Sequence, residues 1–183
     1  MGRLKHLAVL FALIFSAGAM VASSASAATQ SPAGTNTTPT EITKPAWVHQ
    51  CAAMHCGYHA VGAHTAAKAY CWVSHEGILW DLVTTSAPWD PAVQIVGYVS
   101  EDALSPTEDF DNCANVGLPS RSAPTTYWAH SCPLASCGYG VINEGHWMQP
   151  QFSVQSNGQT WWVVLDHSSP DYQLAGYIYP FTP

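Results

Sequence analysis

The feature that most constrains the fold of this chain is an internal duplication at an offset of 81 residues. The offset aligns "CAAMHCGY" (51–58) with "CPLASCGY" (132–139) without a gap. It also pairs Trp47 with Trp128, His49 with His130, Gly77 with Gly158, Trp80 with Trp161 and, after a two-residue deletion, 97–99 with 176–178. Units of about 55 to 65 residues have a marginal core and commonly recruit disulfides. The repeat therefore predicts two small, similar domains stapled by disulfides.

The apolar residues of each unit follow the short pattern of β-strands. Candidate strands are 67–73, 78–83 and 94–99 in the first unit, and 150–154, 160–165 and 174–179 in the second. Clusters of Gly, Asn, Asp, Ser and Pro separate them. Asn157 and Gly158 suit a two-residue hairpin turn, and 75–77 occupies the matching place in the first unit. We predict an all-β protein with a first unit at 46–113, a linker at 114–126 and a second unit at 127–183.

The N-terminus has the organisation of a secretory signal peptide. Arg3 and Lys5 precede the apolar run "LAVLFALIF", and the small residues up to Ala27 fit a cleavage site. The run is shorter than the roughly 20 residues that cross a bilayer. We expect a signal peptide at 1–27 cleaved near Ala27, a secreted extracellular protein without a membrane anchor, and a disordered Thr/Pro/Ser leader at 28–45.

The charge of the mature chain limits its partners. Beyond the expected cleavage site, the cations Lys44, Lys68 and Arg121 stand against twelve acidic residues. So few cations cannot form a phosphate-binding surface, so we expect no nucleic-acid and no membrane partner. Charged residues make up 9% of the chain and aromatic residues 11%, a balance that suits polymer or peptide ligands.

The cysteines are divided unequally between the units, and this division predicts their pairing. An even number of cysteines in an exported chain indicates disulfides. Two cysteines recur in both units, whereas the other two belong to the first unit alone. The simplest partition is Cys51–Cys56, Cys132–Cys137 and Cys71–Cys113. The third pair would link the acidic tail of the first unit, residues 105–120, to its strand 67–73.

A metal site is the alternative interpretation of the first cysteine pair, because His49, His55 and His59 lie near it in the sequence. Of these, only His49 recurs in the second unit, as His130. A zinc site usually needs four ligands, including a second ligand pair, and here two thiols would have to stay reduced outside the cell. We therefore expect neither a metal nor another cofactor.

The order of these segments resembles the bacterial SH3-like domain found in small exported actinobacterial proteins. The resemblance is carried by the Cys-Gly-Tyr opening, the strand "AKAYCWV", and "GILWDLV" followed by "VGYVSEDAL". It covers 47–113, and it extends to 128–180 through the repeat. The resemblance implies two tandem small SH3-like β-barrels whose usual role is binding, often to peptidoglycan peptides or other wall material, and it does not imply catalysis.

Motifs of catalytic chemistry are absent from the sequence. It contains no G-x-S-x-G, no H-E-x-x-H and no papain-like cysteine neighbourhood. The carboxylates Glu101, Asp102, Glu108, Asp109 and Asp111 lack the spacing of an EF-hand calcium loop, which favours an exposed acidic turn. We expect no enzymatic activity, and a secreted hydrolase with an unrecognised site is the weakest hypothesis.

Aromatic residues are the best candidates for ligand contacts. Those inside strand patterns are expected in the core: Trp80, Trp161, Tyr98 and Tyr177. Tyr58 and Tyr139 lie beside the repeated staples and are candidates for a groove, while Trp89 lies at an expected loop tip, 86–94. The leading hypothesis is a binding protein for wall peptidoglycan or another extracellular polymer, with avidity if both units engage it. The alternative is a protein-interaction or structural module, inhibitor or toxin-like, that uses the loop 86–94.

Overall fold

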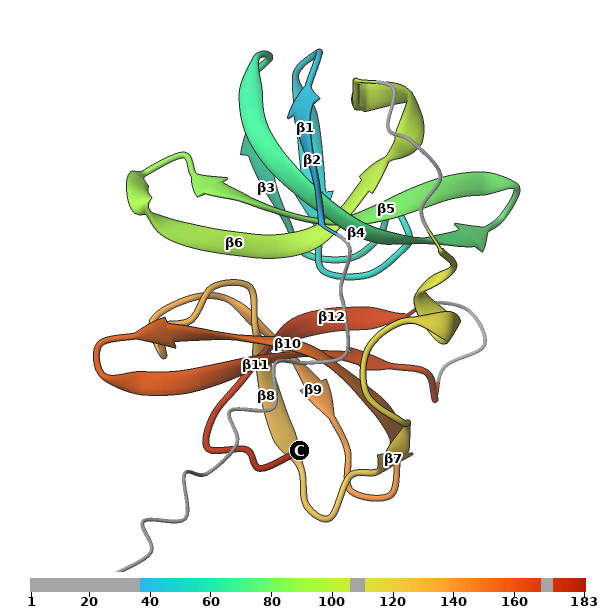
Figure 1. The fold of residues 1–183 in the computed structure, drawn as a ribbon, viewed down its shortest axis with the longest axis vertical. Coiled ribbons are helices and arrows are strands. Elements are labelled where there is room, and N and C mark those ends of the chain that lie inside the picture. Colours follow the sequence, from blue (N-terminus) through green and yellow to red (C-terminus); the bar gives the residue numbers. More distant parts are fainter. Residues whose placement is uncertain (1–36, 106–110, 169–172) are drawn as a thin grey trace, which may run out of the picture.

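The computed structural model describes residues 37–105, 111–168 and 173–183, and these form two six-stranded antiparallel sheets (Figure 1). The first sheet contains β1 (Thr38–Ile42), β2 (Ala46–His49), β3 (Tyr58–Val61), β4 (Thr65–His75), β5 (Ile78–Ala87) and β6 (Asp90–Ser100). The second contains β7 (Arg121–Ser122), β8 (Tyr127–His130), β9 (Tyr139–Ile142), β10 (Trp147–Ser156), β11 (Gln159–Asp166) and β12 (Leu174–Ile178). Two 3₁₀ turns, η1 (Glu101–Ala103) and η2 (Cys113–Asn115), follow β6.

The two sheets have corresponding topologies, with strand orders β1-β4-β5-β6-β2-β3 and β7-β10-β11-β12-β8-β9. The all-β prediction is confirmed. Five predicted strands lie within β4, β5, β6, β10 and β11, and the sixth, 174–179, exceeds β12 by its last residue. Asn157 and Gly158 have the positive φ angles expected for the hairpin turn, as do Glu76 and Gly77 in the first unit. Within the described residues the edge strands of each sheet do not pair with each other, so the sheets are open, whereas we expected closed barrels.

The expected disordered leader is wrong for its last residues, because β1 begins at Thr38. Backbone pairing with β4 orders this polar segment, in a register that runs from Thr38 opposite Ala69 to Ile42 opposite Thr65. The Ile42 side chain at the end of β1 is fully buried in the hydrophobic core of the first sheet. The expected signal peptide at 1–27 lies outside the described residues.

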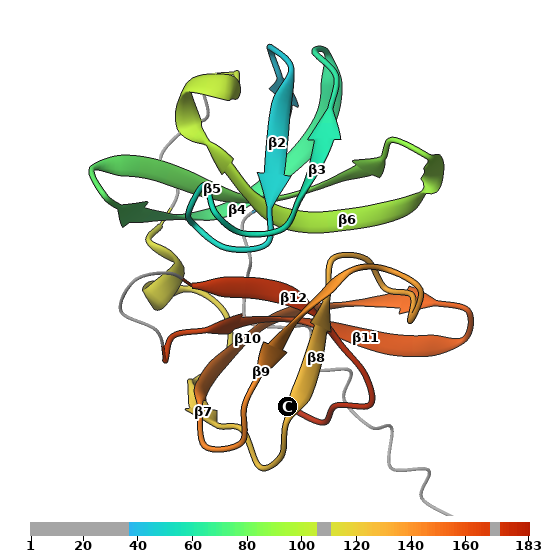
Figure 2. The same ribbon diagram turned by 180° about the vertical axis from the view of Figure 1, so that it is seen from behind.

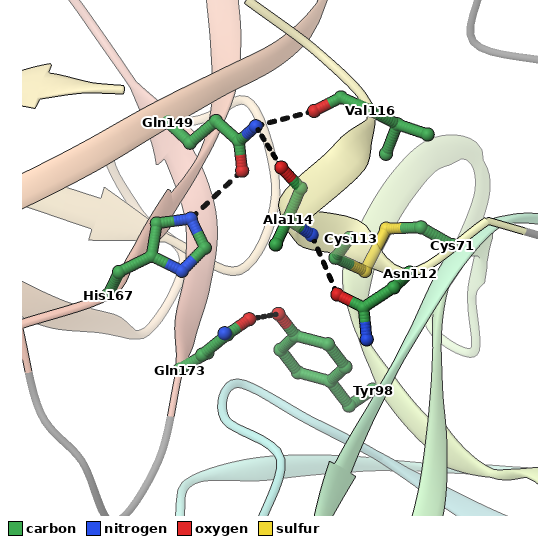
Figure 3. Close-up of a disulfide and its surroundings, with 9 residues drawn as sticks. All are labelled: Cys71, Tyr98, Asn112, Cys113, Ala114, Val116, Gln149, His167 and Gln173. Carbon is green, nitrogen blue, oxygen red and sulfur yellow. Dashed lines mark hydrogen bonds between the residues drawn. A yellow bond between two sulfur atoms is a disulfide. The ribbon is translucent and has the colours of Figure 1, made fainter. Parts of the chain in front are cut away.

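The predicted linker packs against both sheets around the Cys71–Cys113 disulfide (Figure 3). The Asn112 side chain accepts a hydrogen bond from the Ala114 N–H at 3.0 Å and begins the turn η2. The Gln149 amide of the second sheet donates to the carbonyls of Ala114 and Val116, at 3.5 and 2.6 Å. The segment after the disulfide is therefore a structural joint between the two units.

The two sheets lie one above the other and share a hydrophobic core (Figures 1 and 2). Tyr70 of β4 and Phe152 of β10 stack across this core, with ring centroids 4.1 Å apart and planes 8° from parallel. Matching residues of both repeats line it: Trp80, Leu82, Val96 and Tyr98 from the first unit, and Trp161, Val163, Ala175 and Tyr177 from the second. Each small unit thus gains the apolar burial that it lacks alone.

Two reciprocal hydrogen bonds show how the units are related. The Val96 N–H donates to the Ser131 carbonyl at 2.9 Å, and the Ala175 N–H donates to the Gln50 carbonyl at 2.7 Å. Gln50 and Ser131 are equivalent in the repeat, as are Val96 and Ala175. The contact is therefore self-complementary, like that of a two-fold symmetric dimer.

The part of the chain that the structure describes contains no apolar helix of the length needed to span a membrane.

Candidate functional site

The hairpin of β2 and β3 carries an exposed pair of stacked aromatic rings. Trp47 and Tyr58 have ring centroids 4.8 Å apart and planes 26° from parallel. Trp47 and His49 are two positions apart on β2, so their side chains point to the same face, and Tyr58 lies opposite His49 in register. About half of the surface of each ring-bearing residue remains exposed, 51% for Trp47 and 52% for Tyr58. The pair forms a flat apolar platform open to solvent.

The platform rests on His49 and Trp80, which are both buried. The His49 ring meets the Trp80 ring edge-on, with centroids 5.5 Å apart and planes at 83°. Burial lowers the pKa of His49 below its ordinary value, and the Cys56 carbonyl opposes this shift only in part. The imidazole is therefore neutral at neutral pH and serves as a packing group under the platform.

A groove of about 440 Å³ opens beside the platform, a volume within the usual range of small-molecule sites. Apolar side chains dominate its lining: Pro45, Ala46, Trp47, Met54, Ala60, Val61, Trp80 and Ala103. The lining also contains polar groups: the Lys44 ammonium contacts an Asp102 carboxylate oxygen at 2.6 Å. The Ser100 hydroxyl donates to the other carboxylate oxygen at 2.7 Å. An apolar lining with few polar groups suits a ligand that has both a flat apolar face and hydroxyl or amide groups.

The second unit repeats the aromatic arrangement. Trp128 and Tyr139 stack with centroids 5.4 Å apart and planes at 24°, and both are more than half exposed. His130 lies beneath them and meets Trp161 edge-on at 5.8 Å. The His130 ring nitrogen Nδ1 lies 3.1 Å from the Cys137 carbonyl, which ties it to the staple. In addition, the ring of Tyr179 lies against Trp161, at 5.4 Å between centroids.

All three predicted disulfides are present. They join Cys51 with Cys56, Cys71 with Cys113, and Cys132 with Cys137. Each short disulfide closes the loop between the two strands that carry the aromatic platform, β2 and β3 or β8 and β9. Three disulfides indicate an oxidising, extracellular environment.

One group of side chains in the first staple has metal-ligand composition, formed by Cys51, His55 and Cys56. Both sulfur atoms are bonded to each other, so neither is a thiolate that binds a metal ion. His55 is then the only remaining ligand of this group. The structure therefore favours a disulfide over a metal site at Cys51 and Cys56.

The sequence-based ligand candidates fall into different places. Tyr58 and Tyr139 lie in the two aromatic platforms, but Tyr58 is not among the residues that line the groove, so the ligand-contact role of both tyrosines stays a prediction. Trp89 lies at the turn between β5 and β6, as expected, but it contacts His59 with centroids 4.9 Å apart. Since His59 and Tyr58 are neighbours on β3, their side chains point to opposite faces, and Trp89 is not part of the Tyr58 platform. Its contact role stays a prediction.

Several groove residues were not among the sequence-based candidates. Lys44 was assigned to the leader and Asp102 to an acidic turn, and Ser100 was given no role of its own. Trp47 had a usable signal, because it recurs as Trp128 at a fixed distance before each staple. The sequence holds no comparable signal for the Lys44 contact, because 58 residues separate the two partners of this ion pair.

Comparisons with known proteins give no family for the chain: no protein-family model, curated protein or solved structure matches it. The resemblance to SH3-like domains therefore rests on the sequence motifs given above. The geometry of the groove carries the functional proposal.

Proposed function

We propose that this chain is a secreted, non-catalytic binding protein built from two SH3-like units, and that the groove beside Trp47 and Tyr58 binds cell-wall peptidoglycan or another extracellular polymer. The main support for this proposal is the exposed, stacked aromatic pair next to an apolar groove. Contiguous exposed apolar surface often marks an interaction site, and aromatic side chains dominate the energetics of many interfaces.

The rest of the molecule supports a binding role. The platform is held by antiparallel pairing of β2 with β3, by the Cys51–Cys56 disulfide and by the buried Trp80 beneath it. Such a site is rigid before the ligand arrives, which lowers the entropy cost of binding. The disulfides also fit a protein that works outside the cell, where wall polymers are accessible.

Sedimentation with insoluble peptidoglycan tests this proposal. The mature protein is expected to pellet with the polymer, and Trp47→Ala is expected to weaken pelleting at least tenfold because it removes half of the platform. Trp147→Ala is the matched control, since Trp147 is also an exposed tryptophan, at 57%, but does not line the groove. Equal pelleting of the Trp47→Ala variant and the wild type would reject the site, and absence of wild-type pelleting would reject the peptidoglycan ligand.

A second candidate function is contact with a protein partner through the turn that carries Trp89. The observation in its favour is that 54% of Trp89 is exposed at the tip of a hairpin. Under this alternative, Trp89→Ala rather than Trp47→Ala would abolish binding to the partner. The same sedimentation assay and a pull-down with the two variants therefore separate the candidates.

A further inference from the structure

We propose that the two aromatic sites are not equivalent: the groove of the first unit takes one sugar ring of a glycan chain, and Tyr179 closes the matching place in the second unit. This inference rests on the proposed function and adds the ligand chemistry and the number of sites per chain. It replaces the expectation that both units bind one polymer with avidity.

The strand register fixes which residues correspond. Ser100 is the last residue of β6 and lies opposite Trp80 of β5. Both of them line the groove of the first unit. After the two-residue deletion in the repeat, Ser100 corresponds to Tyr179, and Trp80 corresponds to Trp161. The same position beside the same indole thus carries a hydroxymethyl group in one unit and a phenol ring in the other.

The two side chains have opposite effects on the space above the repeated tryptophan. In the first unit Ser100 is small, and the groove next to Trp80 is open. In the second unit the Tyr179 ring lies against Trp161, with centroids 5.4 Å apart and planes at 35°. The Tyr179 ring, 45% of which stays exposed, therefore lies in the second unit at the position where the first unit has only the Ser100 hydroxymethyl group beside the groove.

The polar groups of the groove select a sugar ring over other six-membered rings. One face of a sugar ring consists of C–H groups and can pack on the exposed indole of Trp47, while the hydroxyl and amide groups of the ring stay free to form hydrogen bonds. The groove offers the Ser100 hydroxyl and the Lys44–Asp102 pair. This pair is neutral as a whole, and the chain has an acidic excess of seven charges, so the site offers no attraction to a polyanion.

Exchanging the two residues tests the inference. Soluble tetramers of β-1,4-linked N-acetylglucosamine are titrated calorimetrically into the mature protein, and one site per chain is expected. Ser100→Tyr is expected to weaken binding at least tenfold by closing the groove. Tyr179→Ser is expected to open a second site, weaker than the first because Thr125 and Phe181 stand where the first unit has Lys44 and Asp102. Gln94→Tyr adds the same ring at an exposed position of the same strand, outside the groove, and Tyr179→Phe keeps the ring that closes the second site. Thermal unfolding of each variant verifies that it folds.

The outcomes separate this inference from the proposed function. Two sites in the wild type, unchanged affinity in the Ser100→Tyr variant, or a single site in the folded Tyr179→Ser variant would overturn the closed-site inference while leaving groove binding intact. Pelleting with peptidoglycan without any binding of the tetramer would overturn the sugar assignment in favour of the peptide stems. Absence of wild-type binding to both polymer and tetramer would reject the proposed function itself.

Discussion

Asp81 makes a specific prediction about how stability depends on pH. Its side chain is buried in β5, on the face opposite Trp80, and burial together with the nearby charge of Glu101 raises its pKa from 3.8 to about 7. The folded protein therefore holds this proton more tightly than the unfolded chain does. The contribution to stability is complete below about pH 4, and it is lost as the pH rises toward 7. Ionising the buried carboxyl costs about 4 kcal/mol at most.

The Asp81→Asn variant isolates this effect, because the amide stays neutral at every pH. Between pH 5 and pH 8 the stability of the variant relative to the wild type is expected to increase by about 2 to 3 kcal/mol. Comparison with the variant is needed, because burial lowers the pKa of His49 and His59, and their protonation destabilises the fold as the pH falls. Urea unfolding at both pH values, followed by tryptophan fluorescence with the disulfides intact, measures the difference. A stability difference that is the same at pH 5 and pH 8 would refute the reasoning.

Two further predictions concern the scaffold. Replacing Cys71 and Cys113 by alanine removes a cross-link between residues with a sequence separation of 42. This change is expected to lower the free energy of unfolding by about 4 kcal/mol, measured by urea unfolding. A loss below about 1 kcal/mol would contradict the stabilising role of this disulfide. Gly97→Ala is expected to cost about 2 to 3 kcal/mol, because its Cβ would lie 2.3 Å from the His49 carbonyl oxygen. Gly138→Ala is the control, since no atom lies within 4 Å of its added Cβ, and equal melting temperatures of the two variants would contradict the close-approach explanation.

The repeat made the local features of the fold predictable. Strands, hairpin turns and the two short disulfides follow from short-range patterns that occur twice, so that each copy checks the other. The Cys71–Cys113 pair follows from the lack of both cysteines in the second unit. The Gly-Tyr pair at 97–98 was recognised as a recurring motif, and the structure adds the reason for the glycine, which is the close approach of β6 to the His49 backbone. Its counterpart Gly176 meets Ala129 in the same way, with a Cβ contact of 2.7 Å.

Long-range geometry was not predictable from the same patterns. The leader looked disordered because its composition is polar, yet β1 needs only backbone pairing with β4 and the burial of Ile42. The self-complementary contact between the units depends on backbone groups such as the Ser131 carbonyl, which every residue has. A sequence pattern cannot single out such groups. The groove brings together residues from distant segments, such as Lys44, Trp80 and Asp102, so it could not be derived beforehand.

The ¹H–¹⁵N signals of the tryptophan indole groups test the central claim most directly. Nuclear magnetic resonance of the ¹⁵N-labelled mature protein resolves one indole N–H signal for each tryptophan, and each signal is assigned by substitution. On addition of soluble peptidoglycan fragments, we expect the signals of Trp47 and Trp80 to move, while those of Trp128 and Trp161 stay in place. Movement confined to Trp89, or no movement of Trp47 and Trp80 at saturating ligand, would contradict the account.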